Sequence, residues 1–305
     1  MKSLAVIVVD YKTIDKTISY LKMLADMFTD VDLIHAIIID NGEEDKSEQI
    51  NDELQYIEDM KLEERIIKHF WFKNMDVFYC FANENLGYGK GNNLGFKIIE
   101  SFYADSIFLI SNNDIKLTEK LSMNLIENIF NSDNSIAAIG PNIVGLKGEK
   151  QNPYFKPSVF RCAVLMFTFI HNLFKVNIDI DYICKNDYCY RLMGSFIFLK
   201  SDYFKEVGGF DEKIFMYSEE PILSEKLLEK NLHCYYWDDY KVIHEHGATV
   251  KNSISKIQEK KLVFESLIYY LKEYRNVSDF RITLSRWHFN VYLFLYNVIY
   301  RFLRE

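Results

Sequence analysis

Two amides and a carboxylate follow an apolar run near the middle of the chain. The run from 106 to 110 is short and rich in β-formers, as expected of a strand covered on both faces. Asn112, Asn113 and Asp114 come directly after it. Asn and Asp favour turns because they bond their own backbone. Polar groups in this position also form ligand or metal sites, because open α/β sheets bind ligands outside the carboxyl ends of their strands.

Two further clusters in the second half of the chain could do chemistry. Glu219 and Glu220 open a predicted helix, with Pro221 in its first turn. Acids at that position also complement the helix dipole, so they are expected there for stability alone. His244 and His246 are two residues apart on a predicted strand and so project to one face. They suit a metal if a carboxylate comes near, although a strand histidine is more often only hydrogen-bonded.

A glycine-rich loop opens a predicted helix in the first half of the chain. The stretch from Gly87 to Asn93 lacks the GxGxxG spacing and does not follow the first strand, so it gives little support for a dinucleotide site. No GxxxxGK[ST] phosphate loop occurs either. The loop offers backbone amides and Lys90, which suit an anionic or hydroxyl-rich ligand.

Alternating strands and helices must position these groups. Strands are expected at 4–9, 33–40, 76–85 and 106–110, with helices at 14–28, over the charged stretch 43–68, and after the glycine-rich loop. This alternation predicts an α/β fold with a doubly wound, mostly parallel sheet. Polar clusters recur where the strands end: Asp10-Tyr11, Asp40-Asn41, 83–85 and 112–114. Parallel strands end at one edge, so the clusters should converge on one crevice, which favours a binding site over independent turns.

The composition excludes several classes of protein. A net charge of -8 over 305 residues is opposite to the basic footprint that nucleic-acid binding requires. Five scattered cysteines without a CxxC motif indicate reduced thiols in a cytosolic protein, with no disulfide frame and no zinc site. The amino-terminal stretch has too short an apolar core for a signal peptide and is expected to be the first strand.

The carboxyl-terminal segment from 251 to 305 is predicted to be helical and aromatic. Its part from 286 to 303 is shorter than the ~20 clean apolar residues that a membrane span needs. Flanking arginines and aromatic side chains suit a helix in a membrane interface. A helix docked on the domain or on another subunit, as in a homodimer, is the alternative. The stretch 159–176 has the same character and the same ambiguity.

Six motifs, in order over residues 4 to 250, resemble those of the family 2 glycosyltransferases with the GT-A fold, especially bacterial capsule and O-antigen enzymes of the rhamnosyltransferase type. They are VIVVDYK, IIIDNGEED, NENLGYGKGNNLGF, SNNDI, the block MGSFIFLKSDYFKEVGGFDEKIFMYSEE, and VIHEHGAT. The resemblance implies a GT-A catalytic domain over 1–250. Its nucleotide-sugar half would be 1–145 and its acceptor half 190–250.

The resemblance also implies roles for individual positions. Asp114 would hold a diphosphate through a divalent cation, Mn²⁺ or Mg²⁺, with Asn112 in place of the first acid of the DXD motif. His244, His246 or both would complete that site, and Glu220, or else Glu219, would be the catalytic base. The donor would be a UDP- or dTDP-sugar. Its nucleotide would lie against these residues: Tyr11, Asp40, Asn85, Gly87, Lys90, Asn92, Asn112 and Asn113.

These roles form a consistent reaction. A displacement at the anomeric carbon needs a carboxylate to take the acceptor's proton and a cation to neutralise the leaving diphosphate. Because no carboxylate nucleophile is required, inversion is expected. Two departures from the family pattern are Asp10-Tyr11-Lys12, where Thr-Tyr-Asn is usual, and Glu219-Glu220, where Glu-Asp is usual.

The sequence therefore predicts an inverting, metal-dependent glycosyltransferase that extends a bacterial surface glycan. The acceptor would be lipid-linked and the enzyme cytoplasmic, at the inner face of the membrane. One rival is a sugar nucleotidyltransferase, but the residues after the first strand lack its glycine- and arginine-rich loop. The other rival is a non-catalytic, glycan-binding or scaffold member of the same family.

Overall fold

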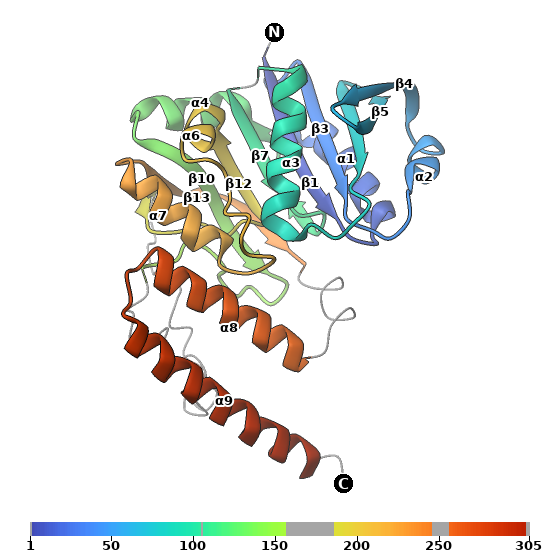
Figure 1. Ribbon diagram of the computed structural model, residues 1–305. Coiled ribbons are helices and arrows are strands. Elements are labelled where there is room, and N and C mark those ends of the chain that lie inside the picture. Colours follow the sequence, from blue (N-terminus) through green and yellow to red (C-terminus); the bar gives the residue numbers. More distant parts are fainter. Residues whose placement is uncertain (1, 105, 157–185, 246–255, 303–305) are drawn as a thin grey trace.

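The computed structural model describes residues 2–104, 106–156, 186–245 and 256–302 (Figure 1). Within these ranges an eleven-stranded sheet has ten strands in the order β11-β13-β10-β12-β7-β1-β3-β6-β5-β4, and β8 pairs with β13. The strands are β1 (Ser3–Asp10), β3 (Leu33–Asp40), β4 (Gln55–Leu62), β5 (Arg65–Phe72), β6 (Met75–Phe81), β7 (Ile107–Ser111), β8 (Ile115–Leu117), β10 (Ile136–Gly145), β11 (Asp187–Cys189), β12 (Phe196–Lys200) and β13 (His233–His244). A separate two-stranded sheet pairs β2 (Phe28–Thr29) with β9 (Leu121–Ser122).

Four adjacent strands, β7, β1, β3 and β6, are parallel. Their apolar residues are buried almost throughout, because helices cover both faces of this part of the sheet. The register pairs Asp10 with Asp40 and Ile7 with Ile110. The carboxyl ends of these strands therefore lie at one edge of the sheet, as the sequence predicts.

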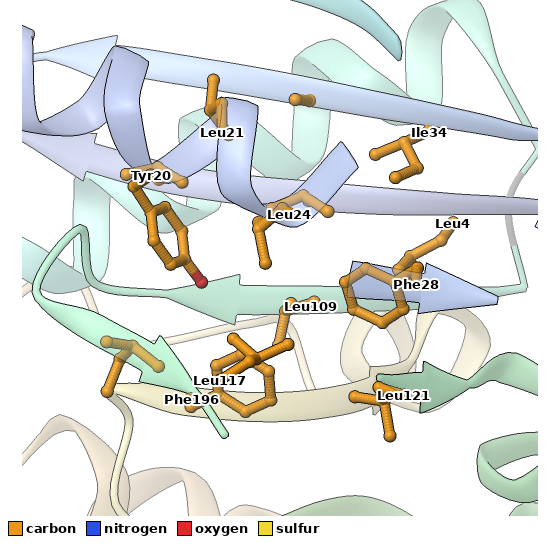
Figure 2. Close-up of a cluster of buried hydrophobic side chains, with 14 of the residues drawn as sticks. Leu4, Tyr20, Leu21, Leu24, Phe28, Ile34, Leu109, Leu117, Leu121 and Phe196 are labelled. Atoms are coloured by element: carbon orange, nitrogen blue, oxygen red, sulfur yellow. The ribbon is translucent and has the colours of Figure 1, made fainter. Parts of the chain in front are cut away.

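Helices cover the two faces of the sheet in two separate apolar clusters. One cluster includes residues of α1 (Ile14–Met27) and α4 (Met123–Ser132), and the other includes residues of α3 (Gly87–Phe102), α6 (Ser201–Glu206) and α7 (Glu219–Glu229). Figure 2 shows part of the first cluster, where Tyr20, Leu21 and Leu24 of α1 lie over Leu4 and Leu109 of the sheet. This arrangement confirms the doubly wound α/β class.

The other half of the sheet is mixed. β12 is antiparallel to both β7 and β10, while β10 and β13 are parallel to each other. The short strand β8, directly after Asp114, is antiparallel to the end of β13 and pairs Ile115 with His244. This pairing brings together two segments that lie far apart in the sequence.

The helix expected over 43–68 is wrong. This stretch contains the short helix α2 (Ser47–Asn51) and then the antiparallel hairpin of β4 and β5, which extends the sheet beyond β6. β4 is an edge strand whose side chains are mostly exposed, so its charges are compatible with a strand as well as with a solvated helix. Ile67 and Phe70 of β5 are buried and anchor the hairpin.

Two helices, α8 (Lys256–Glu273) and α9 (Asp279–Phe302), follow the sheet. They share a third apolar cluster with Ile214 and with Ile222 of α7. In Figure 1, α8 lies beside α7 and α9 is outermost, on the far side of α8 from the sheet. Among the described residues, no helix is long and apolar enough to cross a membrane.

Candidate active site

Backbone and side-chain hydrogen bonds join the polar clusters at the carboxyl edge of the parallel strands. The Asn41 N–H donates to the Asp10 carbonyl oxygen at 2.9 Å, and the Ala82 N–H donates to the Asp40 carbonyl oxygen at 2.9 Å. The Asn113 side chain reaches the Asp10 carboxylate at 3.2 Å. The predicted convergence of these clusters is confirmed.

Asp40 is buried at this edge. Its Oδ1 accepts from the Gly42 N–H at 2.7 Å and its Oδ2 accepts from the Tyr79 hydroxyl at 2.7 Å. Burial raises the pKa of the Asp40 carboxyl, although both hydrogen bonds act in the opposite direction. Tyr11, at the end of β1, is half-buried, and the ammonium group of Lys12 lies 5.2 Å from the centre of its ring. Asp40 and Tyr11 thus lie at the ends of adjacent, paired strands.

Asn113 belongs to a hydrogen-bonded cluster at the start of α1. Its amide nitrogen lies 2.8 Å from the Thr13 hydroxyl and 2.7 Å from the Thr17 hydroxyl. Both threonines donate to Asp10 Oδ1, at 2.7 and 2.6 Å. This cluster fixes the segment that leads to Asp114. The amide nitrogen of Asn113 is committed to it, and the carbonyl end is the part that could still face a ligand.

Asp114 and His244 lie side by side. His244 Nε2 is 3.2 Å from Asp114 Oδ1, and the Glu245 N–H donates to the Asp114 carbonyl oxygen at 2.9 Å. The His244 side chain is only 4% exposed. Its Nδ1 is 2.8 Å from Gln151 Oε1, a carbonyl oxygen that can accept the Nδ1 proton. Gln151 thus fixes the orientation of the imidazole ring.

The donor set around Asp114 fits a divalent cation. When Nδ1 donates to Gln151, Nε2 carries a lone pair, and two acceptors 3.2 Å apart repel each other unless a proton or a cation lies near them. A histidine that ligates a metal through one nitrogen usually donates its other N–H to an oxygen, as His244 can do here. His246 lies outside the described residues. Among those that are described, no three His, Cys, Asp or Glu side chains form a metal cluster.

The glycine-rich loop forms the first turns of α3. The exposed Asn85 accepts from the Gly87 N–H at 3.0 Å, and the amide nitrogen of the buried Asn92 donates to the Tyr88 carbonyl oxygen at 2.9 Å. Gly87 has a φ of 76°, and a Cβ there would lie 2.0 Å from the Phe215 carbonyl oxygen. The loop therefore packs directly against the segment before α7. Lys90 is exposed on the first turns of the same helix.

Tyr88 connects this loop to the acidic pair. Its hydroxyl donates to the Gly194 carbonyl oxygen at 2.7 Å, and the Gly194 N–H donates to Glu220 Oε1 at 3.2 Å. A Cβ at Gly194 would lie 2.4 Å from the Tyr88 hydroxyl. The carbonyl oxygen of the next residue, Ser195, accepts from the backbone N–H of the half-buried Asn112 at 2.9 Å. The strand end that carries Asn112 is therefore linked through this segment to Glu220.

The two glutamates at the start of α7 differ in environment. Glu219 is 3% exposed, whereas Glu220 is half-buried. Burial raises the pKa of Glu219 to about 8, and the negative charge of Glu220 adds to this shift. Both effects favour the protonated form of Glu219. Tyr88 also stays protonated, because burial, together with the charges of Glu220 and Glu219, raises its pKa well above the ordinary value.

Helix α8 holds the segment that leads into the acidic pair. Tyr217 and Ser218 both have left-handed backbone conformations, with φ values of 70° and 67°. Ser266 of α8 donates to the Met216 carbonyl oxygen at 2.6 Å, and the Tyr217 hydroxyl donates to Glu259 at 3.4 Å. Such backbone conformations are costly and persist only where the surroundings enforce them. The contacts with α8 supply that constraint.

Several residues of this site are absent from the sequence-based prediction, among them Tyr79, Tyr88, Gln151 and Gly194. Tyr88 lies inside the glycine-rich loop, and an aromatic residue in such a loop is a signal that could identify it. Neither Gln151 nor Gly194 has a pattern around it that indicates its partner.

No protein-family model matches the sequence, and no curated protein matches it. Solved structures do. A structure of S. aureus TarS 1–349 in complex with UDP-GlcNAc is 15% identical with a TM-score of 0.51, and the match covers 96% of this chain and 73% of that one. A structure of GalNAc-T7 with UDP, GalNAc and Mn²⁺ is 12% identical with a TM-score of 0.52. The match covers 90% of this chain and 49% of that one.

The chain spans 44% of the chain in another S. aureus TarS structure and 49% of the GalNAc-T7 chain. At these identities the likeness concerns the fold. It agrees with the mixed α/β sheet of this chain. The chain therefore has the fold of these structures, the GT-A fold.

Proposed function

We propose that this protein is an inverting, metal-dependent glycosyltransferase, which moves a sugar from a nucleotide-diphosphate sugar to a hydroxyl group of a glycan. The observation that carries the proposal is the pair Glu219 and Glu220. The pair opens α7, where Glu219 lies beside Gly89 of the glycine-rich loop and Glu220 is linked to Tyr88 of the same loop through Gly194.

Glu220 is the catalytic base in this proposal. Glu219 is buried, and burial raises its pKa, whereas Glu220 is only half-buried and can be reached by an acceptor hydroxyl. The acceptor hydroxyl gives its proton to Glu220 while its oxygen bonds to the anomeric carbon. The bond between that carbon and the diphosphate breaks, which releases a nucleoside diphosphate. A single displacement of this kind inverts the anomeric configuration.

Asp114 and His244 would hold Mn²⁺ or Mg²⁺, with Gln151 orienting the imidazole. A bound cation supplies charge that neutralises the leaving diphosphate. In this proposal the protein supplies only a few ligands. This is typical of cations that are bound through one or two carboxylates together with substrate phosphates. Lys90, exposed on the first turns of α3, would contact the diphosphate.

The donor is proposed to be a UDP- or dTDP-sugar. Asp40 and Tyr11, at adjacent strand ends, would face the nucleotide base, because this edge of an open α/β sheet is where nucleotides bind. The matched structures of TarS and GalNAc-T7 contain UDP-GlcNAc and UDP, respectively, which makes UDP-sugars the first donors to test. A screen of nucleotide sugars would also show whether a hexose or a rhamnose is transferred.

The setting follows from the resemblance of the motifs. We propose a role in bacterial capsule or O-antigen synthesis, with a lipid-linked acceptor at the cytoplasmic face of the membrane. A sugar nucleotidyltransferase is less well supported, because the turn after β1 is occupied by the bonds of Asp10 to Thr13 and Thr17 and has no glycine- and arginine-rich loop.

The test is a screen of UDP- and dTDP-sugars for release of nucleoside diphosphate, with and without Mn²⁺. We expect one donor to be turned over in Mn²⁺ by the unaltered chain. Donor binding without any turnover, also after addition of glycan acceptors, would favour the non-catalytic alternative. Release of pyrophosphate from a sugar phosphate and a nucleoside triphosphate would favour the nucleotidyltransferase.

A further inference from the structure

Helix α9 has an apolar face that points away from α8. Its members are exposed and recur at intervals of four and three residues: Phe280, Leu284, Trp287, Val291 and Phe294. At about 100° per residue, this spacing places all of them on one side of the helix. Phe280, Trp287 and Phe294 are 78%, 64% and 68% exposed. Three large aromatic rings thus line one exposed face over about 21 Å of helix.

The opposite side of α9 packs against α8. Ser285, Phe289 and Tyr292 are buried there, and the Phe289 ring stacks on Phe264 of α8 with 3.9 Å between ring centres. Figure 1 shows α9 as the outermost element of the structure. The helix therefore has two apolar faces, one packed on α8 and the other directed outward.

The charge of α9 differs in sign from that of the whole chain. Its sequence contains three arginines and one aspartate, which gives a formal charge of +2 in a chain of net charge -8. The aspartate, Asp279, pairs with Lys272 of α8 at 3.1 Å. On a helical projection the exposed Arg281 lies on one flank of the apolar face. Arg286 lies on the other side of the helix, nearer α8, and pairs with Glu265 of α8 at 2.7 Å.

We infer that the outer face of α9 binds the surface of an anionic lipid bilayer, with the helix parallel to the membrane plane. Phe, Leu and Trp along one face with arginines beside them are typical of helices that lie in the membrane interface. Trp is also enriched at the level of the lipid head groups. Arg281 would contact lipid phosphates while the aromatic rings enter the acyl region.

A second copy of the chain is the other possible occupant of this face, because a spacing of three and four residues also occurs in coiled coils. Charge disfavours it. Two copies of α9 would bring together two helices that each have a formal charge of +2, and the one acid of each helix is already paired with Lys272. An anionic bilayer supplies the complementary charge that a second α9 lacks.

The inference is tested on the full chain by flotation with vesicles, in the absence of any nucleotide or sugar. One set of vesicles contains phosphatidylcholine alone, and the other contains phosphatidylcholine with phosphatidylglycerol. We expect salt-sensitive binding to the second set. Replacing both Trp287→Ser and Phe294→Ser should weaken this binding more than about tenfold. Arg281→Gln should weaken it about fivefold.

A matched control replaces two equally exposed apolar residues elsewhere, Ile66→Ser and Leu146→Ser, which are 60% and 69% exposed. This control should bind the vesicles as the unaltered chain does. Two results would overturn the inference. One is that the unaltered chain binds neither set of vesicles. The other is a lipid-free dimer by light scattering that Trp287→Ser with Phe294→Ser converts to a monomer, which would assign the face to a second copy.

Discussion

The hydroxyl of Tyr88 donates a hydrogen bond to the carbonyl oxygen of Gly194, 106 positions away in the sequence. Through this bond the glycine-rich loop of α3 holds Gly194, whose N–H group donates to Glu220. Tyr88 thus acts on the proposed base indirectly, by positioning the backbone that holds it.

Tyr88→Phe should therefore slow sugar transfer and leave donor affinity nearly unchanged, because Gly194 loses the bond that orients its N–H group. The loss of one hydrogen bond should lower the free energy of unfolding by about 0.5–1.5 kcal/mol. Tyr203→Phe is the matched control, since the Tyr203 hydroxyl also donates to a carbonyl oxygen, that of Asn134, at 2.6 Å. Equal transfer rates in the two variants would show that Tyr88 has only a structural role.

Removing the charge of Asp114 should make donor binding independent of metal. In Mn²⁺, Asp114→Asn is expected to bind the nucleotide sugar no more tightly than the unaltered chain does in EDTA. Gln151→Ala should weaken Mn²⁺ binding by about 10–100-fold, the usual effect of losing a group that orients a ligating histidine. Calorimetric titration with Mn²⁺ and with donor checks both. Unaltered Mn²⁺ affinity in both variants would exclude the cation from this part of the sheet edge.

Glu220→Gln should reduce transfer to the acceptor by about 10²–10⁴, the usual weight of general base catalysis. Donor affinity should hardly change, because the substitution keeps the shape of the side chain. A role limited to the helix dipole predicts only a stability loss of ~0.3–1 kcal/mol. Rates of transfer and calorimetric donor affinities, measured for Glu220→Gln and Glu219→Gln separately, distinguish the two roles. If Glu219→Gln alone loses transfer, the base is Glu219.

The buried Glu219 should make stability fall with rising pH. Its folded pKa is raised to about 8 from an ordinary value of 4.5, so the folded state binds more protons than the unfolded state between these values. Its stabilisation is complete below about pH 4.5 and is lost as the pH rises through about 8, with a slope of at most about 1.4 kcal/mol per pH unit. Glu219→Gln removes this term.

Urea unfolding at several pH values between 5 and 8 measures the effect. The stability of Glu219→Gln relative to the unaltered chain should increase steadily across this range. Glu225→Gln, in the same helix, changes another buried carboxylate and should not reproduce that pH profile. A constant difference between Glu219→Gln and the unaltered chain would mean that Glu219 is ionised in the folded protein.

The sequence predicts those parts of the site that lie at the carboxyl ends of the parallel strands. Because parallel strands end at one edge, Asp10, Asp40 and Asn113 could be placed together before their contacts were known. The proximity of Asp114 and His244 could likewise be proposed, since both follow or end apolar runs. The roles of these residues in binding metal and donor stay predictions until the experiments above are done.

Other features depend on pairings between distant segments that no local pattern encodes. Gln151 meets His244 across 93 positions because β10 pairs with β13. The hairpin of β4 and β5 was missed because an exposed edge strand buries too little to show an apolar alternation. The unequal burial of Glu219 and Glu220 likewise arises from tertiary packing.

The contacts between α8 and the segment before α7 have a consequence for the order of events during synthesis. A ribosome makes the chain from its amino-terminal end, so the acidic pair is made well before the residues that constrain it. Three residues of this segment form hydrogen bonds with residues that are translated much later. Glu259 follows Tyr217 by 42 positions, and Ser266 follows Met216 by 50. Tyr274, directly after α8, follows Asp211 by 63. The sheet can form earlier, but Glu219 and Glu220 acquire their final geometry only when α8 has been translated. A chain whose synthesis stops before α8 would therefore lack the contacts that hold the segment before Glu219 and Glu220 in place.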